Sequence, residues 1–253
     1  MPSAADCQAA PLVPLSGAVV RITDRQGESG TADLVDGLLE QARLEQLIET
    51  VKPPIPCDWL DASKGRPMPS HPLLLTPFRY PPLVSGSRFG RAHQRHLFYG
   101  ARALETALAE RSFHALRMLD DSPLPEGARL QRLQTAFSVE ITAHRGLSLQ
   151  AHLTPEVLAA ITDPSSYATS QRCGDTMRER GVQAFEVPSA RSPLTPPVVG
   201  VLTPYAFGST PFDFQDWTLE ISAVGVTAVS FAGGLKGTFP RAQFLVEGLW
   251  PVP

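Results

Sequence analysis

Proline is the residue type that most constrains how this chain can fold. The sequence has 25 prolines among 253 residues, about twice the usual share of ~5%. Each proline fixes its own φ, lacks a backbone donor and disfavours helix at the residue before it. Prolines recur every few residues from Lys52 to Pro82, so we expect an extended wrap or linker there. The sequence therefore predicts an N-terminal arm at 1–70, a boundary near residue 70 and a main domain at 71–253.

The arm contains one segment with a clear helical pattern. In "TADLVDGLLEQARLEQLIETV" apolar residues recur near helical spacing, and Thr31 is a suitable N-cap. Residues 1–31 are rich in proline, glycine and small side chains, so we expect irregular chain apart from a short strand at "GAVVRI". The helix at 33–51 has no obvious partner for its apolar face within the arm, which predicts a contact with another chain.

The segment after residue 70 alternates between strand and helix patterns. We expect helices at "RALETALAERSFHALRML", "EGARLQRLQTAF" and "SQRCGDTMRER", the last of them ending at Gly181. We expect strands at "LFYGA", "FSVEITA", "VQAFEV", "PVVGVLT", "WTLEIS" and "VTAVSF", and a tight hairpin turn at "FAGGLKG". These elements predict a mixed α+β fold with a split sheet and flanking helices.

Charge, cysteines and hydropathy exclude several classes of protein. The net charge of -3 and the pI near 6.1 lack the basic footprint of a nucleic-acid binder. Three widely spaced cysteines (Cys7, Cys57 and Cys173) argue against a disulfide framework and against CxxC metal sites. Apolar runs stay well short of the roughly 18 residues of a membrane span. We therefore expect a cytoplasmic protein without a membrane segment.

The motifs of several common enzyme classes are missing from the sequence. It contains no GxGxxG after a strand, no Walker loop, no HExxH and no GxSxG. The histidines, which include His93, His96 and His114, offer no pair at i, i+4 with a carboxylate as a third ligand. We therefore expect no metal site.

Two stretches carry the most specific signal. They are "TPFRYPPLVSGSRFGRAHQRHLFYGARALETALAER" at 76–111 and "SSYATSQRCGDTMRERGVQAFEVPSARSP" at 165–193. Together they resemble the RES-domain family, named for an Arg, a Glu and a Ser, over about residues 71–210. The pieces "FRYPP", "GSRFG", "FYGA", "TALAE" and "VPSAR" occur in order, with "TSQ" before the last. Two features depart from the family pattern: the long segment before residue 71, and Ala101 where a serine is frequent.

The resemblance implies a fold, an activity and a set of site residues. Family members are toxins of bacterial type II toxin-antitoxin pairs, have a fold like the catalytic domain of ADP-ribosyltransferases and destroy NAD by cleaving its nicotinamide-ribose bond. NAD would thus be a substrate and not a cofactor. The resemblance makes 71–253 the catalytic domain. The positions that match the family's catalytic or NAD-binding residues are Arg79, Tyr80, Arg88, Tyr99, Glu110 and Ser189.

The chemistry of these side chains agrees with that implication. The planar guanidinium group of Arg79 or of Arg88 can bind two phosphate oxygens at once. We expect both arginines in loops. Tyr99 can stack on nicotinamide, and the Glu110 carboxylate can stabilise an oxocarbenium-like transition state. Ser189 can donate a hydrogen bond to a phosphate or to the nicotinamide amide. The catalytic set would be Glu110 with Arg79 and Tyr99.

The identity of the acceptor stays open at the level of sequence. Phosphate or water would make the protein an NAD phosphorylase or glycohydrolase, whereas a protein side chain would make it a protein ADP-ribosyltransferase. A noncatalytic NAD-sensing module is a third reading. Because a free NAD-cleaving enzyme would harm its host, we expect a cognate antitoxin that blocks the site, and a homo-oligomer or a toxin-antitoxin hetero-oligomer.

Overall fold

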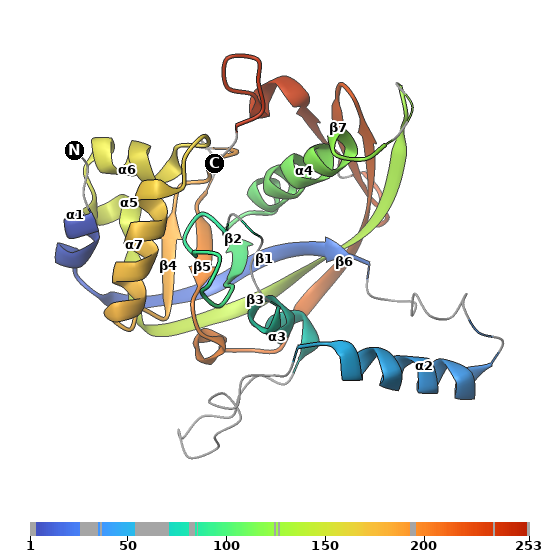
Figure 1. Ribbon diagram of the computed structural model, residues 1–253, viewed down its shortest axis with the longest axis horizontal. Helices are drawn as coiled ribbons and strands as arrows, with labels where there is room; N and C mark the ends of the chain where they lie inside the picture. Colours follow the sequence, from blue (N-terminus) through green and yellow to red (C-terminus); the bar gives the residue numbers. More distant parts are fainter. Residues whose placement is uncertain are drawn as a thin grey trace.

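The computed structural model describes residues 4–25, 35, 37–53, 71–80, 84, 86–123, 125, 127–192, 196–234 and 236–251. The helices are α1 (Ala4–Ala9), α2 (Leu38–Val51), α3 (Pro72–Arg79), α4 (Leu104–Asp120), α5 (Leu149–His152), α6 (Pro155–Thr162) and α7 (Ala168–Glu179), with short 3-10 turns η4 (Pro204–Ala206) and η5 (Arg241–Phe244). The strands are β1 (Val13–Asp24), β2 (Phe98–Ala101), β3 (Leu130–Ser148), β4 (Ala184–Val187), β5 (Val198–Val201), β6 (Phe212–Ser222), β7 (Gly225–Ser230) and β8 (Lys236–Pro240). Figure 1 shows the strands as one strongly curved sheet with helices outside it.

Five of the strands close into a ring. The sheet order runs β1-β2-β5-β4-β3-β6-β7-β8, and β1 also pairs with β3. The β1–β3 pairing is antiparallel and extends from Val13↔Gly146 to Asp24↔Gln134. The strands β1, β2, β5, β4 and β3 therefore form a small barrel, from which β6, β7 and β8 extend as a wing.

The long strand β3 divides the sheet. Its first half pairs with β6 from Leu130↔Ile221 to Ser138↔Phe212, and its last residues pair in parallel with β4 at Gly146–Ser148. Between these two pairings the edge of β3 opposite β1 changes partner, so the wing and the barrel separate there. The expected mixed α+β fold with a split sheet and flanking helices is confirmed.

The barrel interior is filled by alternate residues of its strands. These buried side chains include Leu15, Val19, Phe98, Phe137, Val139, Ile141, Ala184, Val199 and Val201. Leu74 and Phe78 of α3 and Ala206 of η4 belong to the same cluster. Because successive strand residues point to opposite faces, the remaining residues of these strands face outward, toward the helices.

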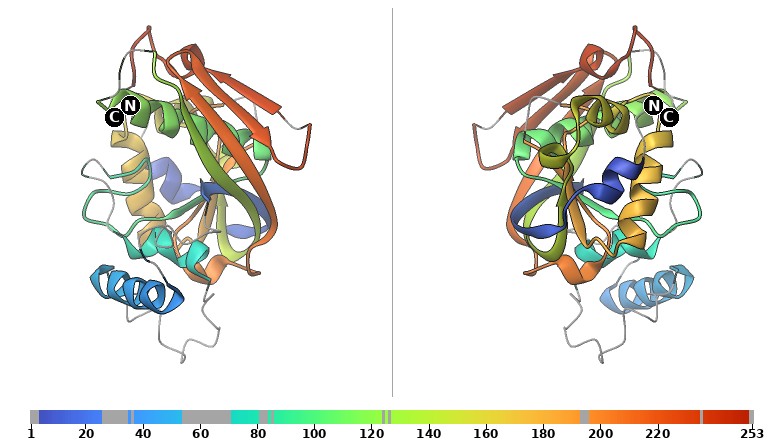
Figure 2. Two further views of the ribbon diagram at one scale, coloured as in Figure 1. Left: turned by 90° about the vertical axis from the view of Figure 1, so that its right-hand side faces the viewer. Right: turned by 90° about the vertical axis from the view of Figure 1, so that its left-hand side faces the viewer.

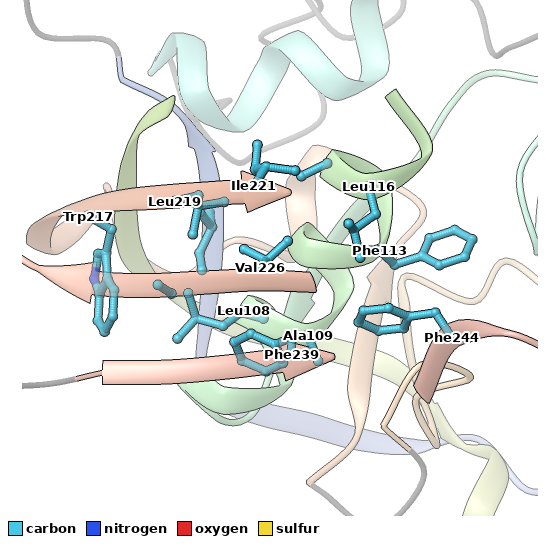
Figure 3. Packing of buried hydrophobic residues seen from close by; sticks show 14 of the residues in the cluster. Leu108, Ala109, Phe113, Leu116, Trp217, Leu219, Ile221, Val226, Phe239 and Phe244 are labelled. Atoms are coloured by element: carbon cyan, nitrogen blue, oxygen red, sulfur yellow. The ribbon is translucent and has the colours of Figure 1, made fainter. Parts of the chain in front are cut away.

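Helices cover the outside on two sides. Figure 3 shows α4 packed on the wing, where Leu108, Phe113 and Leu116 meet Trp217, Leu219 and Phe239. On the other side α7 packs on β4 and its neighbours, and Met177 lies in a cluster with Phe89 and Phe185. The two views of Figure 2 show α7 and α1 side by side, away from the wing.

Residues 4–9 form helix α1 and residues 13–24 form strand β1, so the expectation of irregular chain outside "GAVVRI" is wrong for 4–9, 13–16, 23 and 24. The predicted strand at "GAVVRI" is confirmed but is much longer, because β1 pairs along its whole length with β3. The expected helix at 33–51 is confirmed from Leu38 onward. Thr31, the expected cap, lies outside the described residues.

Two other expectations from the sequence are wrong. The segment "EGARLQRLQTAF" forms the start of β3 and not a helix. Its leucines fit a helical spacing, but β1 and β6 hydrogen-bond to both edges of this segment, and sheet pairing overrides intrinsic propensity. The stretch from Lys52 to Pro82 was expected to be extended, but residues 72–79 within it form helix α3, which begins at Pro72. Residues 54–70, around the expected boundary, lie outside the described residues.

Two expected turns are confirmed. Gly181 follows α7 with φ of 66°, and the Val182 N–H donates to the Met177 carbonyl at 2.9 Å, as in a glycine-terminated helix. The "FAGGLKG" segment joins β7 to β8 as an antiparallel hairpin, and both Gly233 and Gly234 have positive φ. Glycine suits these positions because it has no Cβ.

A disulfide joins Cys7 of α1 to Cys173 of α7, which corrects the expectation that the cysteines form no disulfide. The two residues are 166 positions apart in sequence, and their Cα atoms are 5.7 Å apart. Both side chains are buried. The spacing of three cysteines could not reveal this pair, because the fold of the sheet is what brings the chain's start onto α7.

The barrel core provides a direct test of the fold. We expect Phe137→Ala to lower the free energy of unfolding by about 3–5 kcal/mol, because Phe137 is fully buried in the barrel. Leu133→Ala, on the same strand and the same face but 44% exposed, should cost less than about 1 kcal/mol. Urea denaturation of both variants measures the difference. Equal losses would contradict a closed, filled barrel.

Candidate active site

Glu110 and Ser189 meet at the centre of the candidate site. Glu110 is half-buried in the middle of α4, whose apolar residues on either side pack on the wing. Ser189 follows β4 and is 1% exposed. Its hydroxyl donates to Glu110 Oε1 at 2.6 Å, a short bond of the charge-assisted kind. The structure thus brings together the two residues that the sequence analysis placed 79 positions apart.

The turn after β4 fixes the Ser189 hydroxyl. Its Oγ accepts hydrogen bonds from the backbone N–H groups of Arg191 at 3.1 Å and Ser192 at 3.0 Å. This is the local turn that serine commonly forms with its own backbone. With both acceptor positions used, the hydroxyl proton points to the Glu110 carboxylate. Ser189 therefore orients Glu110.

Arg191 is a site residue that the sequence analysis did not identify. Its side chain is only 7% exposed, and its guanidinium carbon lies 3.5 Å from the centre of the Phe113 ring. Burial lowers the pKa of Arg191, whereas the Glu110 charge opposes that shift. The arginine in "VPSAR" was the available signal, and only the fold reveals that it turns back onto α4.

Arg88 lies in the tight turn closed by Ser87 and Gly90. Its Nη1 donates to the carbonyls of Asp163 at 2.8 Å and Ile161 at 3.2 Å. Its guanidinium lies 5.1 Å from the centre of the Tyr167 ring. Nη2 is buried without a hydrogen-bond partner among the described residues. Arg88 is therefore in a loop, as expected, and holds a donor that a ligand oxygen could satisfy.

Tyr99 of β2 contacts the turn that carries Arg88. Its hydroxyl accepts the Phe89 N–H at 3.3 Å, and burial raises the pKa of Tyr99 to about 12. Tyr99 is therefore a neutral phenol that supports the turn. The stacking of its ring on nicotinamide stays a prediction.

Arg79 and Tyr80 lie elsewhere on the molecule. Arg79 is the last residue of α3 and not in a loop, which corrects that expectation. Its Nε donates to the Pro53 carbonyl, and Tyr80 is 39% exposed. Figures 1 and 2 show α3 below the barrel and α4 above it. The contacts that join Glu110 to Ser189 and Arg191 do not involve these two residues, so their assignment depends on the sequence resemblance.

Two further arginines act electrostatically on His114, one helical turn after Glu110, and neither was identified from sequence. Arg21 of β1 donates to the Tyr99 carbonyl at 3.0 Å, and its pKa is lowered to about 10 by burial and by the charge of Arg111. Arg111 bonds Asp24 and Gln134, each at 2.5 Å. The sequence signal for Arg21 was an arginine within an otherwise apolar strand.

His114 is one helical turn after Glu110. Its side chain is exposed, although the protein packed around the ring still desolvates the imidazole. Burial, and then the charges of Arg191, Arg111 and Arg21, lower the pKa of His114 to about 4. The imidazole is therefore uncharged at neutral pH. Its neighbours make this end of α4 strongly electropositive.

The structure also has a depression away from Glu110 and Ser189. It is on the wing and is lined by Gln131, Thr218, Glu220, Thr227, Val229, Ser230 and Phe231. Thr218 and Glu220 alternate with the residues that face α4, so this depression lies on the opposite face of the wing. Within the described residues, no cluster of three histidine, cysteine, aspartate or glutamate side chains could hold a metal ion. In the same part of the chain, no helix could cross a membrane.

The shifted pKa of His114 predicts how stability depends on pH. In the unfolded chain the imidazole has an ordinary pKa near 6.5. Between about pH 6.5 and 4, His114 is therefore protonated in the unfolded chain but not in the folded protein. Stability should therefore fall as the pH falls through this window. We expect His114→Gln to make the fall shallower, and thermal melts from pH 7.5 to 4.5 measure it. His93→Gln, in an exposed loop, is the control, and identical slopes in all three proteins would refute the shift.

Comparison with known proteins assigns the family. The model of the RES domain matches residues 66–220, which include Arg79, Arg88, Tyr99, Glu110 and Ser189. Among solved structures, a chain of the crystal structure of the M. tuberculosis MbcT-MbcA toxin-antitoxin complex is similar, with 12% identity, a TM-score of 0.46, and coverage of 84% of this chain and 90% of that chain. No curated protein matches the sequence. Because the matched segment covers more than half of its length, the chain belongs to the RES domain family.

Proposed function

We propose that this protein is the toxin of a type II toxin-antitoxin pair and that it degrades NAD by cleaving the bond between nicotinamide and ribose. One observation carries the proposal most directly. The Glu110 carboxylate is oriented by the buried Ser189 hydroxyl and lies among arginines, within the segment that matches the RES domain. A carboxylate fixed close to buried arginine charge suits a substrate with two phosphates and a cleavable glycosidic bond.

The reaction follows from the charges that develop on NAD. When the bond from C1′ to the nicotinamide nitrogen breaks, nicotinamide leaves with the electron pair and the ribose acquires oxocarbenium character. The Glu110 carboxylate would stabilise that positive charge. Ser189 keeps the carboxylate in one orientation and so reduces the reorganisation that the transition state requires. NAD is consumed, so it is the substrate.

The arginines would bind the anionic parts of the substrates. Arg88 has a buried Nη2 without a hydrogen-bond partner among the described residues, and Arg191 interacts electrostatically with both Arg88 and Glu110. We propose that Arg88, with Arg79 and Tyr80 as the resemblance implies, holds the NAD pyrophosphate. Tyr99 would contribute to the same pocket by its ring and by its support of the Arg88 turn.

The group of Arg21, Arg111 and Arg191 favours an anionic acceptor. These three charges surround an uncharged His114 one turn from Glu110, and they would attract inorganic phosphate more strongly than water. Attack of a phosphate oxygen on C1′ would give ADP-ribose carrying a phosphate at C1′, and attack of water would give ADP-ribose and a proton. We propose phosphorolysis as the main reaction. Depletion of NAD would take place in the cytoplasm, where a cognate antitoxin would keep the enzyme inactive.

The first test removes the Glu110 charge. In Glu110→Gln the amide oxygen can still accept the Ser189 hydrogen bond, and Gln and Glu have similar helix propensity, so the fold should persist. We expect nicotinamide release to fall on the order of 10²- to 10³-fold, mainly in kcat. The assay follows NAD with and without phosphate and identifies the products. Expression of the wild-type chain alone should arrest growth, whereas the Gln variant should not.

The control for this test is Glu105→Gln, an exposed glutamate in the first turn of the same helix. It should release nicotinamide like the wild type. A Glu110→Gln protein that melts normally and still releases nicotinamide within threefold of wild type would remove Glu110 from the mechanism. A wild-type chain that leaves NAD and growth unchanged would refute the proposed function.

The second test concerns the arginine fork. Arg79→Lys and Arg88→Lys keep the charge but lose the planar pair of donors. Each should weaken NAD binding by about 1.5–3 kcal/mol, the value of a hydrogen bond to a charged group. Calorimetric titration in the Glu110→Gln background measures binding without turnover. Arg117→Lys, near the far end of α4, is the control, and wild-type affinity in Arg79→Lys would assign the pyrophosphate to Arg88 and Arg191 instead.

A further inference from the structure

We propose that the Cys7–Cys173 disulfide is a redox switch for the candidate site: the oxidised pair keeps α7 in place, and α7 in turn holds the turn that carries Arg88. The inference depends on the proposed function for its effect on NAD. The coupling from the disulfide to the Arg88 turn stands on contacts within the protein and can be measured without NAD.

One face of α7 holds the loop of residues 87–94. Gln171, Gly174, Asp175 and Arg178 recur at i, i+3, i+4 and i+7, so they share a face. Their contacts with the loop are Gln171 Nε2 to the Ser87 carbonyl at 3.2 Å, Arg178 Nη1 to the Phe89 carbonyl at 2.7 Å, and Asp175 to Arg91 at 2.8 Å and to Gln94 at 2.6 Å.

Gly174 makes this contact close. A Cβ at Gly174 would lie 2.2 Å from the Phe89 carbonyl oxygen, so the loop backbone rests directly on the helix. Phe89 is the residue after Arg88, and its N–H bonds the Tyr99 hydroxyl. A shift of α7 would therefore move the backbone on which the Arg88 side chain depends.

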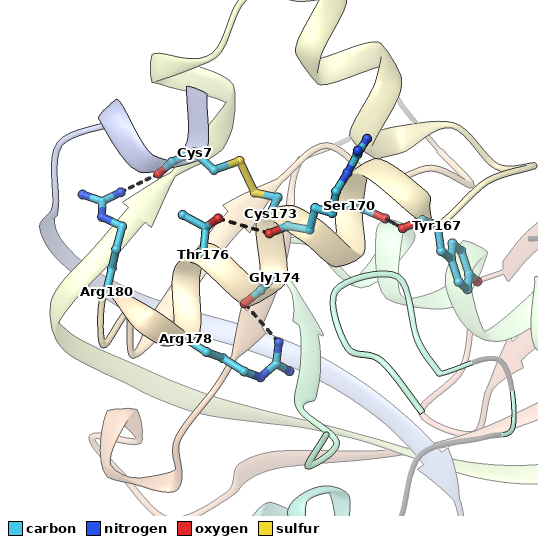
Figure 4. The surroundings of a disulfide bond; sticks show 9 residues. Cys7, Tyr167, Ser170, Cys173, Gly174, Thr176, Arg178 and Arg180 are labelled. Atoms are coloured by element: carbon cyan, nitrogen blue, oxygen red, sulfur yellow. Dashed lines mark hydrogen bonds between the residues drawn. A yellow bond between two sulfur atoms is a disulfide. The ribbon is translucent and has the colours of Figure 1, made fainter. Parts of the chain in front are cut away.

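A different face of α7 carries the disulfide. Ser170, Cys173 and Met177 are fully buried, and Cys173 bonds Cys7 of α1 (Figure 4). Arg180, just after α7, donates to the carbonyls of Cys7 at 2.5 Å and Ala10 at 2.7 Å. Helix α1 has six residues, too few to be stable alone. The disulfide is thus the covalent part of the attachment between α1 and α7.

The start of α7 reaches the site directly. Tyr167, immediately before the helix, lies under the Arg88 guanidinium and also interacts with Arg191. The positions of Arg88 and Arg191 therefore both depend on where α7 begins. The helix connects the disulfide on one face to two parts of the site.

Reduction of the pair would release this restraint. A dithiol reduces the disulfide to two thiols and is itself oxidised to a cyclic disulfide. Both sulfurs are buried under α1, so the dithiol reaches them when α1 opens transiently. After reduction α1 is held by noncovalent contacts, among them the Arg180 hydrogen bonds, and we expect α7 and the loop 87–94 to open more often. Reducing conditions would then weaken the site, and oxidation would restore it.

The test uses the full chain in a Cys57→Ser background, so that the pair supplies all the thiols. Thiol titration in denaturant should find none in the oxidised protein and two per chain after dithiothreitol. We expect reduction, and equally Cys7→Ser, to speed amide hydrogen exchange in α7 and in residues 87–94. With Glu110→Gln added, reduction should weaken NAD binding on the order of tenfold, the size typical of coupling between two sites, and reoxidation should reverse the change.

Val226→Ala is the matched control. It removes buried volume from the wing core and lowers stability without touching α1 or α7. Faster exchange confined to α1 after reduction, or the same increase at 87–94 in Val226→Ala, would overturn the proposal. An oxidised protein that neither binds nor cleaves NAD would refute the proposed function, whereas the exchange comparison would still decide the coupling.

Discussion

The long antiparallel pairing of β1 with β3 closes the barrel, and the arrangement of the site depends on that closure. Because β1 occupies one edge of β3, the opposite edge of β3 pairs with β6 near its start and with β4 near its end. The division places α4 over the wing and α7 over the barrel. Glu110 comes from α4, and Ser189 comes from the turn after β4, the strand that α7 covers. Their hydrogen bond therefore joins the two halves of the fold.

The electrostatics of the site follow from the same geometry. Arg21 of β1, Arg111 of α4 and Arg191 of the turn after β4 act on His114. Arg111 also acts on Arg21, and Arg88 of the turn before β2 acts on Arg191. Such mutual repulsion costs stability unless counter-charges or ligands offset it. Asp24 and Glu110 supply part of the compensation within the protein. This excess of positive charge is what would favour an anionic substrate at the candidate site.

Helix α7 supports the candidate site through contacts of its own. Helix α7 contributes no carboxylate to the chemistry, yet it carries the loop of Arg88 on one face and the disulfide to α1 on another. Glycine at 174 allows the loop backbone to lie directly on the helix. The N-terminal residues therefore serve the candidate site, although they lie outside the segment that matches the family.

The sequence by itself determined helices α2, α4 and α7, strands β2 and β4 to β7, and the split α+β class, because local periodicity carries that information. Its short motifs also singled out Glu110 and Ser189, which the structure places in contact. Only the tertiary structure decided that residues 130–136 are strand, that the whole of 13–24 pairs with β3, and that Cys7 meets Cys173. Each of these depends on partners far away in sequence, which no local pattern records. For the same reason Arg21, Arg111 and Arg191 were missed: an arginine becomes a site residue through the charges beside it, and the folded barrel alone brings those charges together.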